Sequence, residues 1–292
     1  MKYGFVLEHQ SIWPITWMCR MLGVSQSGFH GWRGRAPSKR AVANERLLGL
    51  IRTSFLASDK TYGSPRVFRD LTDWGECTSK KRVARLMRLA CLRARPKRRR
   101  RPIDVDLRPE HTIAPNVLDR QFAAEGPNKK WAADFTYLWT AEGWLYVAAV
   151  MDLFSRKVVG WSMSASMTAQ LVIDALMMAV WRRGKPKALL HHSDQGSQYR
   201  SEDFQRLLAD QGVLCSMSKR GDCWDNAVVE SFFSSLKMER TNRKRYRSRD
   251  EARSDVFNYI ERFYNPRRRH STLGQVSPDQ FERNWATIGG VC

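Results

Sequence analysis

The second half of the chain alternates strand-like and helix-like segments in an order that few folds accommodate. Three runs rich in β-branched and aromatic residues, 130–139, 144–152 and 157–163, are separated by short turns, which predicts an antiparallel meander of three strands. After the third run the pattern predicts a helix, a short buried strand, a second helix, a second strand and a last helix. These five segments are 168–183, 188–192, 201–210, 213–217 and a helix that begins near Asp225.

Three strands followed by helix, strand, helix, strand and helix is the element order of the ribonuclease H fold. We therefore predict an α/β protein with a ribonuclease H-like catalytic core over residues 129–240, built on a mixed five-stranded sheet with helices. An all-α DNA-binding region is expected before it. At 292 residues the chain exceeds one typical domain, and its 42% hydrophobic content suffices for at least one sizeable core.

Charge narrows the class of partner. Lys and Arg total 50 against 29 Asp and Glu, and a chain with the resulting net charge of +21 repels itself unless a polyanion neutralises it. The stretch 80–101 holds twelve basic residues and no acidic one, which favours nucleic acid as the partner. Because we find no membrane-spanning apolar run and no signal peptide at Met1, we expect no membrane association and a cytoplasmic, nucleoid-associated protein.

The six cysteines form no C-x-x-C pair and have no histidine at a partnering spacing. This usage argues against a structural zinc site and against a disulfide framework, and it fits a reduced compartment. A DNA-reading module in this chain is therefore expected to be built without zinc.

Two stretches before the core have helix-turn-helix character. In 1–40, a short helix opened by Pro14 is followed by a turn and by a helix that Ser25 caps. In 41–101 three helices are predicted, and the third, 80–92, has an apolar stripe with its basic residues outward, which suits the major groove. The candidate DNA contacts in and after this helix are Lys81, Arg82, Arg85, Arg88, Lys97, Arg98, Arg99 and Arg100.

The stretch 102–128, rich in proline and charge, has little periodicity and is expected to be an extended linker along a phosphate backbone. Ordinary helical hairpins with solvated basic faces are the alternative for both helical stretches. The uninterrupted basic run favours DNA binding for 41–101.

Three acidic residues stand on different elements of the predicted core. Asp134 lies inside the first strand, among aromatic and small residues that offer a carboxylate no partner. Asp194 follows the fourth strand, and Glu230 lies in the last helix on the face that it shares with Asn226. Each alone also has an ordinary explanation, so it is their combination that predicts a site. Asp152, a further acid at a strand end, is expected to be structural.

Asp194 and Glu230 enclose 35 residues, and this spacing resembles that of the DDE transposases and retroviral integrases. The wider sequence resembles the second-reading-frame transposases (OrfB) of the insertion sequence 3 family, over nearly the entire chain and without a departure at the three carboxylates. The matching segments are Trp131 to Tyr137, Asp152 to Trp161, His192 to Tyr199, Asn226 to Phe233 with Lys237 and Glu239, Tyr264 to Arg267, Leu22 to Ser25, and Tyr62 with Gly63.

The resemblance implies a DNA transposase that cleaves 3′ ends of an insertion sequence and transfers them to another strand. It also implies a protein from an upstream reading frame that is fused to this chain by frameshifting. Because two transposon ends must be joined, we expect at least a homodimer. Its expected partner is double-stranded DNA, namely the terminal repeats of the transposon and the target DNA.

Phosphoryl transfer explains why three carboxylates are needed. Two Mg²⁺ ions about 3.5–4 Å apart must be held by hard oxygen ligands while water and phosphate complete their octahedral shells. We therefore expect Asp134, Asp194 and Glu230 to be both the catalytic residues and the ligands of two Mg²⁺ ions, with Mn²⁺ as a substitute.

Further basic residues follow the core. Lys237 lies seven residues after the glutamate of the last helix and on the same face, where it can meet phosphate. Arg243, Arg245 and the run 267–269 are interpreted as contacts to target or flanking DNA in a basic helical extension over 241–292. A DNA-binding regulator with an inert core and another ribonuclease H-like nuclease remain alternatives. The intact carboxylates and the basic helical region favour the transposase.

Overall fold

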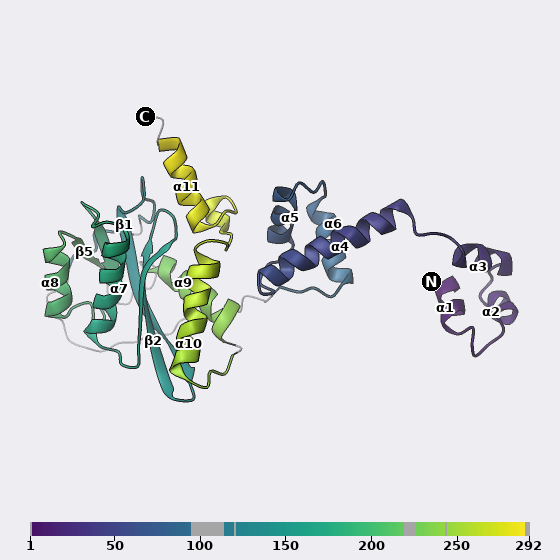
Figure 1. Cartoon of the computed structure of the whole chain (residues 1–292), viewed down its shortest axis with the longest axis horizontal. Helices are drawn as coiled ribbons and strands as arrows, with labels where there is room; N and C mark the ends of the chain where they lie inside the picture. The colour runs from purple at the N-terminus through teal and green to yellow at the C-terminus, as the bar shows by residue number, and fades with distance from the viewer. Residues whose placement is uncertain (1, 95–113, 120, 219–225, 243, 290–292) are drawn as a thin grey trace.

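A computed structural model describes residues 2–94, 114–119, 121–218, 226–242 and 244–289, which form a helical first half and a second half built on a sheet (Figure 1). No helix in these ranges is long and apolar enough to cross a membrane. The cysteines of the same ranges are free thiols.

A mixed five-stranded sheet organises the second half. Strands β1 (Lys130–Thr140), β2 (Gly143–Asp152) and β3 (Val158–Ser164) form an antiparallel meander, to which β4 (Leu190–Ser193) and β5 (Leu214–Met217) add in parallel. The strand order is β3-β2-β1-β4-β5. The five predicted strands are all present, and the predicted α/β class with a ribonuclease H-like core is confirmed.

Helices cover both faces of this sheet. α7 (Ala169–Arg182) and α8 (Glu202–Asp210) pack on one face, and α9 (Ala227–Leu236) and α10 (Arg249–Phe257) on the other (Figure 1). α7 comes closest to β3 at Gly160, where an added Cβ would lie 2.2 Å from a backbone oxygen of the helix. Because only glycine fits there, this residue sets the spacing between helix and sheet.

Two three-helix units make up the first half, each around a small core of its own. Val6, Met18 and Phe29 are buried together in the first unit, and Ile51 and Val83 belong to the core of the second. The helices are α1 (Lys2–Glu8), α2 (Ile15–Met21), α3 (Gln26–Arg33), α4 (Lys39–Ala57), α5 (Ser64–Asp73) and α6 (Lys80–Leu89).

The helix starts follow the expected capping. The Ser25 hydroxyl accepts a hydrogen bond from the Gly28 N–H at 3.0 Å, and the Ser79 hydroxyl accepts one from the Arg82 N–H at 3.2 Å. Each serine thus satisfies an N–H group that the helix itself leaves unpaired. α1 was not expected, because its seven residues are too few to show an apolar repeat; burial of Val6 holds it in place.

The chain after the sheet contains two π-helical stretches. η1 (Lys237–Thr241) continues α9, and η2 (Asn258–Tyr264) continues α10. The short helix η3 (Ser271–Leu273) and α11 (Pro278–Gly289) follow. π-helical turns are rare and are frequently found at functional sites, and one of them begins here at Lys237, directly after α9.

Two arginines that were interpreted as DNA contacts have structural partners instead. Arg268 is buried and donates to both carboxylate oxygens of Glu239, at 2.8 and 2.7 Å. Arg269 donates to Asp70 at 2.7 Å and to Asp73 at 2.6 Å, both on α5. The sequence interpretation was wrong for these two residues because their acidic partners lie far away along the chain.

The same segment joins the two halves of the molecule. The Tyr62 hydroxyl donates to the Arg267 carbonyl oxygen at 3.0 Å and accepts from the Arg269 N–H at 3.1 Å. Arg240, on η1, donates to Asp59 after α4 at 3.0 Å. The unit of α4, α5 and α6 is thus attached to the sheet-containing half through several polar contacts.

We expect Arg268→Ala to lower the free energy of unfolding by about 3–5 kcal/mol, because it leaves the Glu239 carboxylate buried without its partner. Urea denaturation followed by circular dichroism measures the change. Arg267→Ala, which removes the exposed guanidinium next to it, is the matched control. Equal denaturation midpoints for the two variants would contradict a structural role of Arg268.

Candidate active site

Asp134 stands just beyond the seam between β1 and β4. The two strands pair from Lys130 to Ala132, so this carboxylate comes two residues after the paired stretch. Its side chain is partly buried, and Oδ1 accepts a 2.7 Å hydrogen bond from the Phe135 N–H. The sheet therefore presents Asp134 at the carboxyl end of β4, where the chain leaves that strand.

Asp194 and Glu230 come from two other elements. Asp194 directly follows β4, and its Oδ1 accepts a 3.0 Å hydrogen bond from the Gly196 N–H, which shapes the turn. Glu230 lies in the first turn of α9, where burial raises the pKa of its carboxyl. A position inside β1, the end of β4 and the first turn of α9 thus supply the three predicted acids.

Asn226 fastens the start of α9 to the sheet. It is buried directly before the helix, and its Nδ2 donates to the Ala133 carbonyl oxygen at 3.0 Å. Ala133 is the neighbour of Asp134 on β1, so this hydrogen bond fixes Glu230 relative to Asp134. The sequence placed Asn226 on the same helix face as the glutamate but gave no sign of this contact.

The charges of Asp194 and Glu230 both act on Asp134. Burial raises the pKa of Asp134 well above its usual range, and the negative charges of Asp194 and Glu230 raise it further. The Phe135 N–H and the Lys237 ammonium lower this pKa. The structure therefore brings the three sequence-predicted acids into one cluster, together with the lysine predicted to lie near them.

Lys237 is the first residue of η1. Its ammonium nitrogen lies 5.1 Å from the centre of the Tyr137 ring, which is a cation–π contact, and its charge reaches Asp134. The side chain is partly buried. A positive charge thus stands beside the carboxylate cluster at the point where α9 changes to a π-helix.

Tyr199 also lies at the candidate site, although the sequence pattern did not indicate it. Its hydroxyl is buried and, within the described part of the chain, has no hydrogen-bond partner. Burial raises its pKa well above the usual value, and the charges of Asp134 and Asp194 add to the rise. The one available signal was its place in the segment that follows Asp194. Nearby His191 is fully buried, and burial lowers its pKa to about 3, so it adds no positive charge.

The donor set suits a divalent cation by its chemistry. Mg²⁺ prefers carboxylate oxygens, and a cation among three carboxylates offsets the repulsion that raises the pKa of Asp134. Among the residues that the structure describes, no three His, Cys, Asp or Glu side chains already stand in a geometry that could hold a metal ion. The assignment of a divalent cation to this site therefore rests on the carboxylate oxygens as ligands and on the negative charges that act on Asp134.

The candidate DNA contacts divide into three groups. The exposed ones are Lys81, Arg85 and Arg88 on α6 and Arg245 after η1. Arg82 was expected to point outward, but it is partly buried and its Nε donates to Asn44 Oδ1 on α4 at 2.9 Å. The candidates that lie outside the described residues are Lys97, Arg98, Arg99, Arg100 and Arg243.

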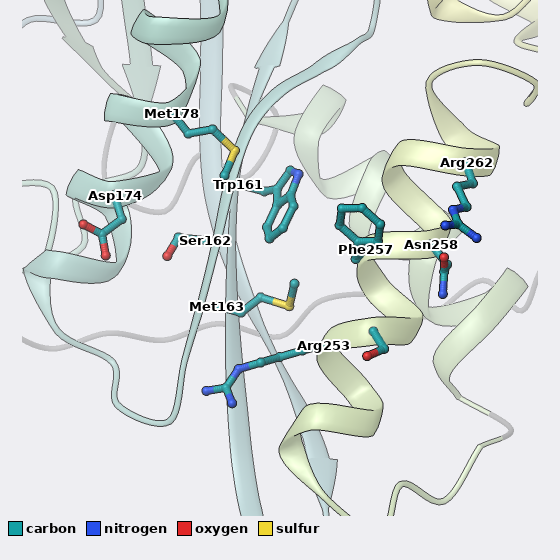
Figure 2. Close-up of a pocket in the computed structure, with 10 residues that line it drawn as sticks. Trp161, Ser162, Met163, Asp174, Met178, Arg253, Phe257, Asn258 and Arg262 are labelled. Carbon is teal, nitrogen blue, oxygen red and sulfur yellow. The ribbon is translucent and has the colours of Figure 1, made fainter.

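A groove of about 610 Å³ between β3, α7 and the α10 to η2 stretch lies apart from the carboxylates (Figure 2). Trp161, Met163 and Phe257 line it, and its acidic side chain is Asp174. Because none of the three clustered carboxylates lines this groove, it is not part of the candidate active site.

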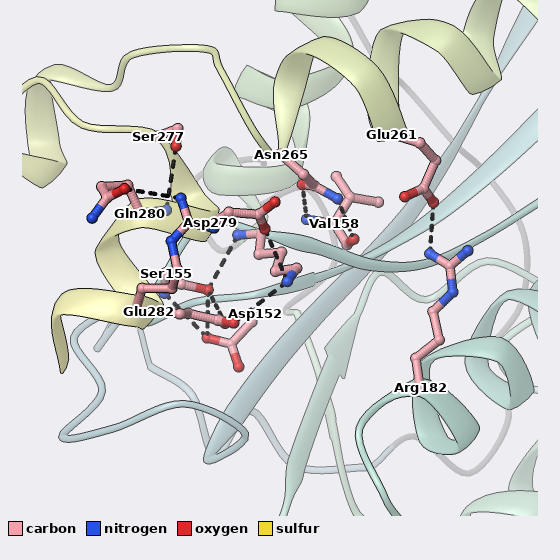
Figure 3. A network of polar contacts seen from close by, with 12 residues as sticks. Asp152, Ser155, Val158, Arg182, Glu261, Asn265, Ser277, Asp279, Gln280 and Glu282 are labelled. Carbon is pink, nitrogen blue, oxygen red and sulfur yellow. Dashed lines mark hydrogen bonds and ion pairs between the residues drawn. The ribbon is translucent and has the colours of Figure 1, made fainter. Parts of the chain in front are cut away.

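Asp152 belongs to a structural network, in line with the expectation (Figure 3). Its buried carboxylate accepts hydrogen bonds from the backbone N–H groups of Asn128, Phe154 and Ser155, at 2.6, 2.9 and 3.2 Å. The Ser155 hydroxyl in turn donates to Glu282 of α11 at 2.7 Å. Asp152 therefore fixes the end of β2 and the last helix.

Three protein-family models match the chain. One described as an integrase core domain matches residues 124–223, and a second with the same description matches 211–278. A third, described as an HTH-like domain, matches residues 43–100. Asp134 and Asp194 fall in the first of these matches and Glu230 in the second.

Two curated relatives align over almost their whole length. Transposase InsF for insertion sequence IS3A from Escherichia coli (strain K12) is 45% identical over 284 residues, 97% of this chain and 98% of the relative. The insertion element IS600 uncharacterized 31 kDa protein from Shigella sonnei is 40% identical over 268 residues, 92% of this chain and 98% of that protein.

Among solved structures, the HTLV-2 integrase catalytic core domain in complex with magnesium is 24% identical to the chain. The match covers 39% of this chain and 70% of the integrase chain, with a TM-score of 0.33. At so low a TM-score, the sequence relatives and the family models carry the comparison.

The raised pKa of Asp134 makes a prediction about stability. A carboxyl whose pKa is higher in the folded than in the unfolded protein stabilises the fold only while it is protonated, and this stabilisation is lost as pH rises through the folded pKa. At pH 7.5 without divalent cations we expect Asp134→Asn to raise the free energy of unfolding by about 0.5–2 kcal/mol.

Urea denaturation in EDTA measures this difference. Asp210→Asn changes an exposed carboxylate at the end of α8 and should leave the midpoint unchanged. An Asp134→Asn protein that unfolds at lower urea than the unsubstituted protein would refute the charge crowding.

Proposed function

The chain belongs to the insertion sequence 3 family of transposases, and from this premise we propose that Asp134, Asp194 and Glu230 are its catalytic carboxylates. It is a DNA transposase of the DDE class of polynucleotidyl transferases. The observation that supports the residue assignment is that burial, the acid at the end of β4 and the acid on α9 together raise the pKa of Asp134 on β1. Such crowding destabilises a fold, and it is typical of sites where chemistry requires it.

The reaction we propose has two steps at this cluster. Water first attacks the phosphorus at the end of the insertion sequence and gives up its proton to solvent, the P–O3′ bond breaks, and the released 3′ oxygen takes up a proton, which leaves a free 3′-OH. This 3′-OH then loses its proton to solvent, its oxygen attacks a phosphodiester of a second strand and forms a new P–O bond, and the displaced 3′ oxygen of that strand takes up a proton. Neither step requires a covalent bond to the protein.

The three carboxylates would hold two Mg²⁺ ions, with Mn²⁺ as a substitute, because their oxygens are the hard ligands that these ions prefer. When bound there, the ions supply Lewis-acid activation of the attacking oxygen and neutralise charge on the leaving oxygen. Asn226, which ties the start of α9 to β1, positions the Glu230 carboxylate for this task.

Two further side chains take part in this proposal, one at the substrate and one at a carboxylate. The Lys237 ammonium, beside Asp134, binds a phosphate oxygen next to the scissile bond. The Tyr199 phenol keeps its proton, because burial and the nearby Asp134 and Asp194 raise its pKa, and it can therefore donate to a carboxylate oxygen and orient it.

The helical first half supplies DNA binding in this proposal. An HTH-like match over residues 43–100 covers α4, α5 and α6, and the exposed basic side chains of α6 suit phosphate contacts. Arg82 supports the helix through Asn44 rather than meeting DNA with a free guanidinium. Arg245 is a further proposed DNA contact, and the basic residues 97–100 and 243 are proposed as contacts from the sequence alone.

The remaining predictions from the sequence are also proposals. We propose that the chain divides into domains at 1–40, 41–101, 102–128, 129–240 and 241–292. We further propose that at least two copies assemble on paired transposon ends and that a protein encoded by an upstream reading frame is a partner. We propose that the substrates are terminal-repeat DNA and target DNA. Activity on DNA also fits a cytoplasmic protein located at the nucleoid.

Asp134→Asn, Asp194→Asn and Glu230→Gln should each reduce Mg²⁺-dependent cleavage and joining of terminal-repeat DNA by at least about 10³-fold, because each removes a carboxylate from the cluster. Gel assays on labelled end DNA measure both steps, and a binding assay on the same DNA should show nearly unchanged affinity. Asp210→Asn is the control. Full activity in any of the three variants would exclude that residue from the site.

Replacing Lys81, Arg85 and Arg88 together by glutamine should make the dependence of DNA affinity on salt shallower. Each lost phosphate contact removes about 0.9 from the slope of log affinity against log salt concentration, so about 2.7 is expected if all three contact phosphate. The control carries the same change at Lys185, Lys187 and Arg206, exposed basic residues near α7 and α8. Indistinguishable slopes for the two triple variants would argue against α6 as the DNA-binding helix.

A further inference from the structure

Three large aromatic side chains are exposed together near the free end of the β1–β2 hairpin. Tyr137 is 54% exposed, Trp139 61% and Trp144 43%. Trp139 and Trp144 face each other across the two strands, and Tyr137 lies two residues earlier on the same face. The hairpin extends past α7, so this end of the sheet lies beyond the helix that covers the rest of the face (Figure 1).

The rings are arranged as a connected surface. Tyr137 and Trp144 meet edge to face with ring centres 5.0 Å apart, and Trp139 and Trp144 do so at 4.8 Å. Edge-to-face packing fixes the rings relative to one another while it leaves ring surface open to an outside partner. Clustered apolar surface of this kind on a soluble domain indicates a binding site.

Positive charge borders the aromatic cluster. The Lys237 ammonium lies 5.1 Å from the centre of the Tyr137 ring, and Arg249 Nε donates to the Trp144 carbonyl oxygen at 3.1 Å. Arg245 is exposed on the segment that runs along the end of the hairpin. Aromatic rings interleaved with cations are the combination that binds unpaired nucleotides, whose bases stack and whose phosphates carry the charge.

The distance from the carboxylates suits the same DNA strand. Asp134 lies an odd number of residues from Tyr137 and Trp139, so its side chain points to the other face of the sheet, and a strand that reaches both places passes around the edge of β1. At about 3.3 Å per residue, the backbone of Tyr137 lies about 10 Å and that of Trp139 about 17 Å along β1 from Asp134. At about 3.4 Å per base step, these distances correspond to about three to five nucleotides. Lys237 connects the two places, since its ammonium contacts the Tyr137 ring and its charge acts on Asp134.

We propose that Tyr137, Trp139 and Trp144 form a stacking platform for one base of the substrate strand, unstacked from the duplex three to five nucleotides from the scissile phosphate. The placement rests on the proposed catalytic role of Asp134. The platform receives a base that has left the duplex, so it holds the bent or opened DNA end in position while its scissile phosphate stays at the carboxylates.

The test is a double-mutant cycle between protein and DNA. End DNA is prepared with a single abasic site at each of the first eight positions on either side of the cleavage site, and binding is measured without divalent cations. For the unsubstituted protein, one abasic position within three to five nucleotides should weaken binding about tenfold. Trp139→Ala combined with Trp144→Ala should bind intact DNA about tenfold more weakly and show no further loss at that position.

Two other variants sharpen this cycle. Trp139→Phe keeps an aromatic ring at this position and should bind intact end DNA with most of the affinity of the unsubstituted protein. Trp181→Ala removes an equally exposed tryptophan with its own cation neighbour, Lys185, from the end of α7, and it should behave as the unsubstituted protein.

Additive losses at every abasic position would overturn the platform. So would a double alanine variant that loses self-association and binds each DNA as before, because the cluster would then be covered by a second copy of the chain. Coupling at one position far outside the three to five nucleotide window would instead contradict the placement of catalysis at Asp134 and leave the platform standing.

Discussion

The rest of the structure depends on the placement of Asp134, which is buried within reach of the negative charges of Asp194 and Glu230. Burial and the charges of Asp194 and Glu230 raise the pKa of Asp134, so the protein keeps the acids together at a cost in stability. The sheet supplies two of them at the seam of β1 and β4, and Asn226 ties the helix carrying the third to β1. Negative charges held this close to one another favour the binding of a cation.

The continuous stretch of α9 and η1 connects this cluster with the remainder of the molecule. Glu230 and Lys237 of this stretch lie near enough to Asp134 for their charges to change its pKa. Further along, Glu239 forms the buried ion pair with Arg268, and Arg240 donates to Asp59. Because the C-terminal segment also contacts α5 through Arg269, the helical half and the active-site half share one set of polar contacts.

The sequence predicted what depends on local pattern. Strand periodicity located the five strands, and capping serines located the starts of α3 and α6. It could not predict contacts between distant segments. The sequence suggested exposed, unpaired guanidinium groups at Arg268, Arg269 and Arg82. In the structure these residues contact Glu239, the aspartates of α5 and Asn44, respectively. The three acids were predicted from their places on three elements of the expected fold, and their role stays a proposal. Tyr199 was missed because burial of a single hydroxyl leaves no mark on the sequence pattern.

The central claim is that Asp134, Asp194 and Glu230 together hold the divalent cations for chemistry on DNA. Anomalous diffraction from crystals of the protein on end DNA with Mn²⁺ tests it most directly, because the ions themselves are located. The account predicts two Mn²⁺ peaks about 3.5–4 Å apart, each within ligand distance of carboxylate oxygens from this set. Manganese bound elsewhere, or a site that Glu230 does not reach, would contradict it.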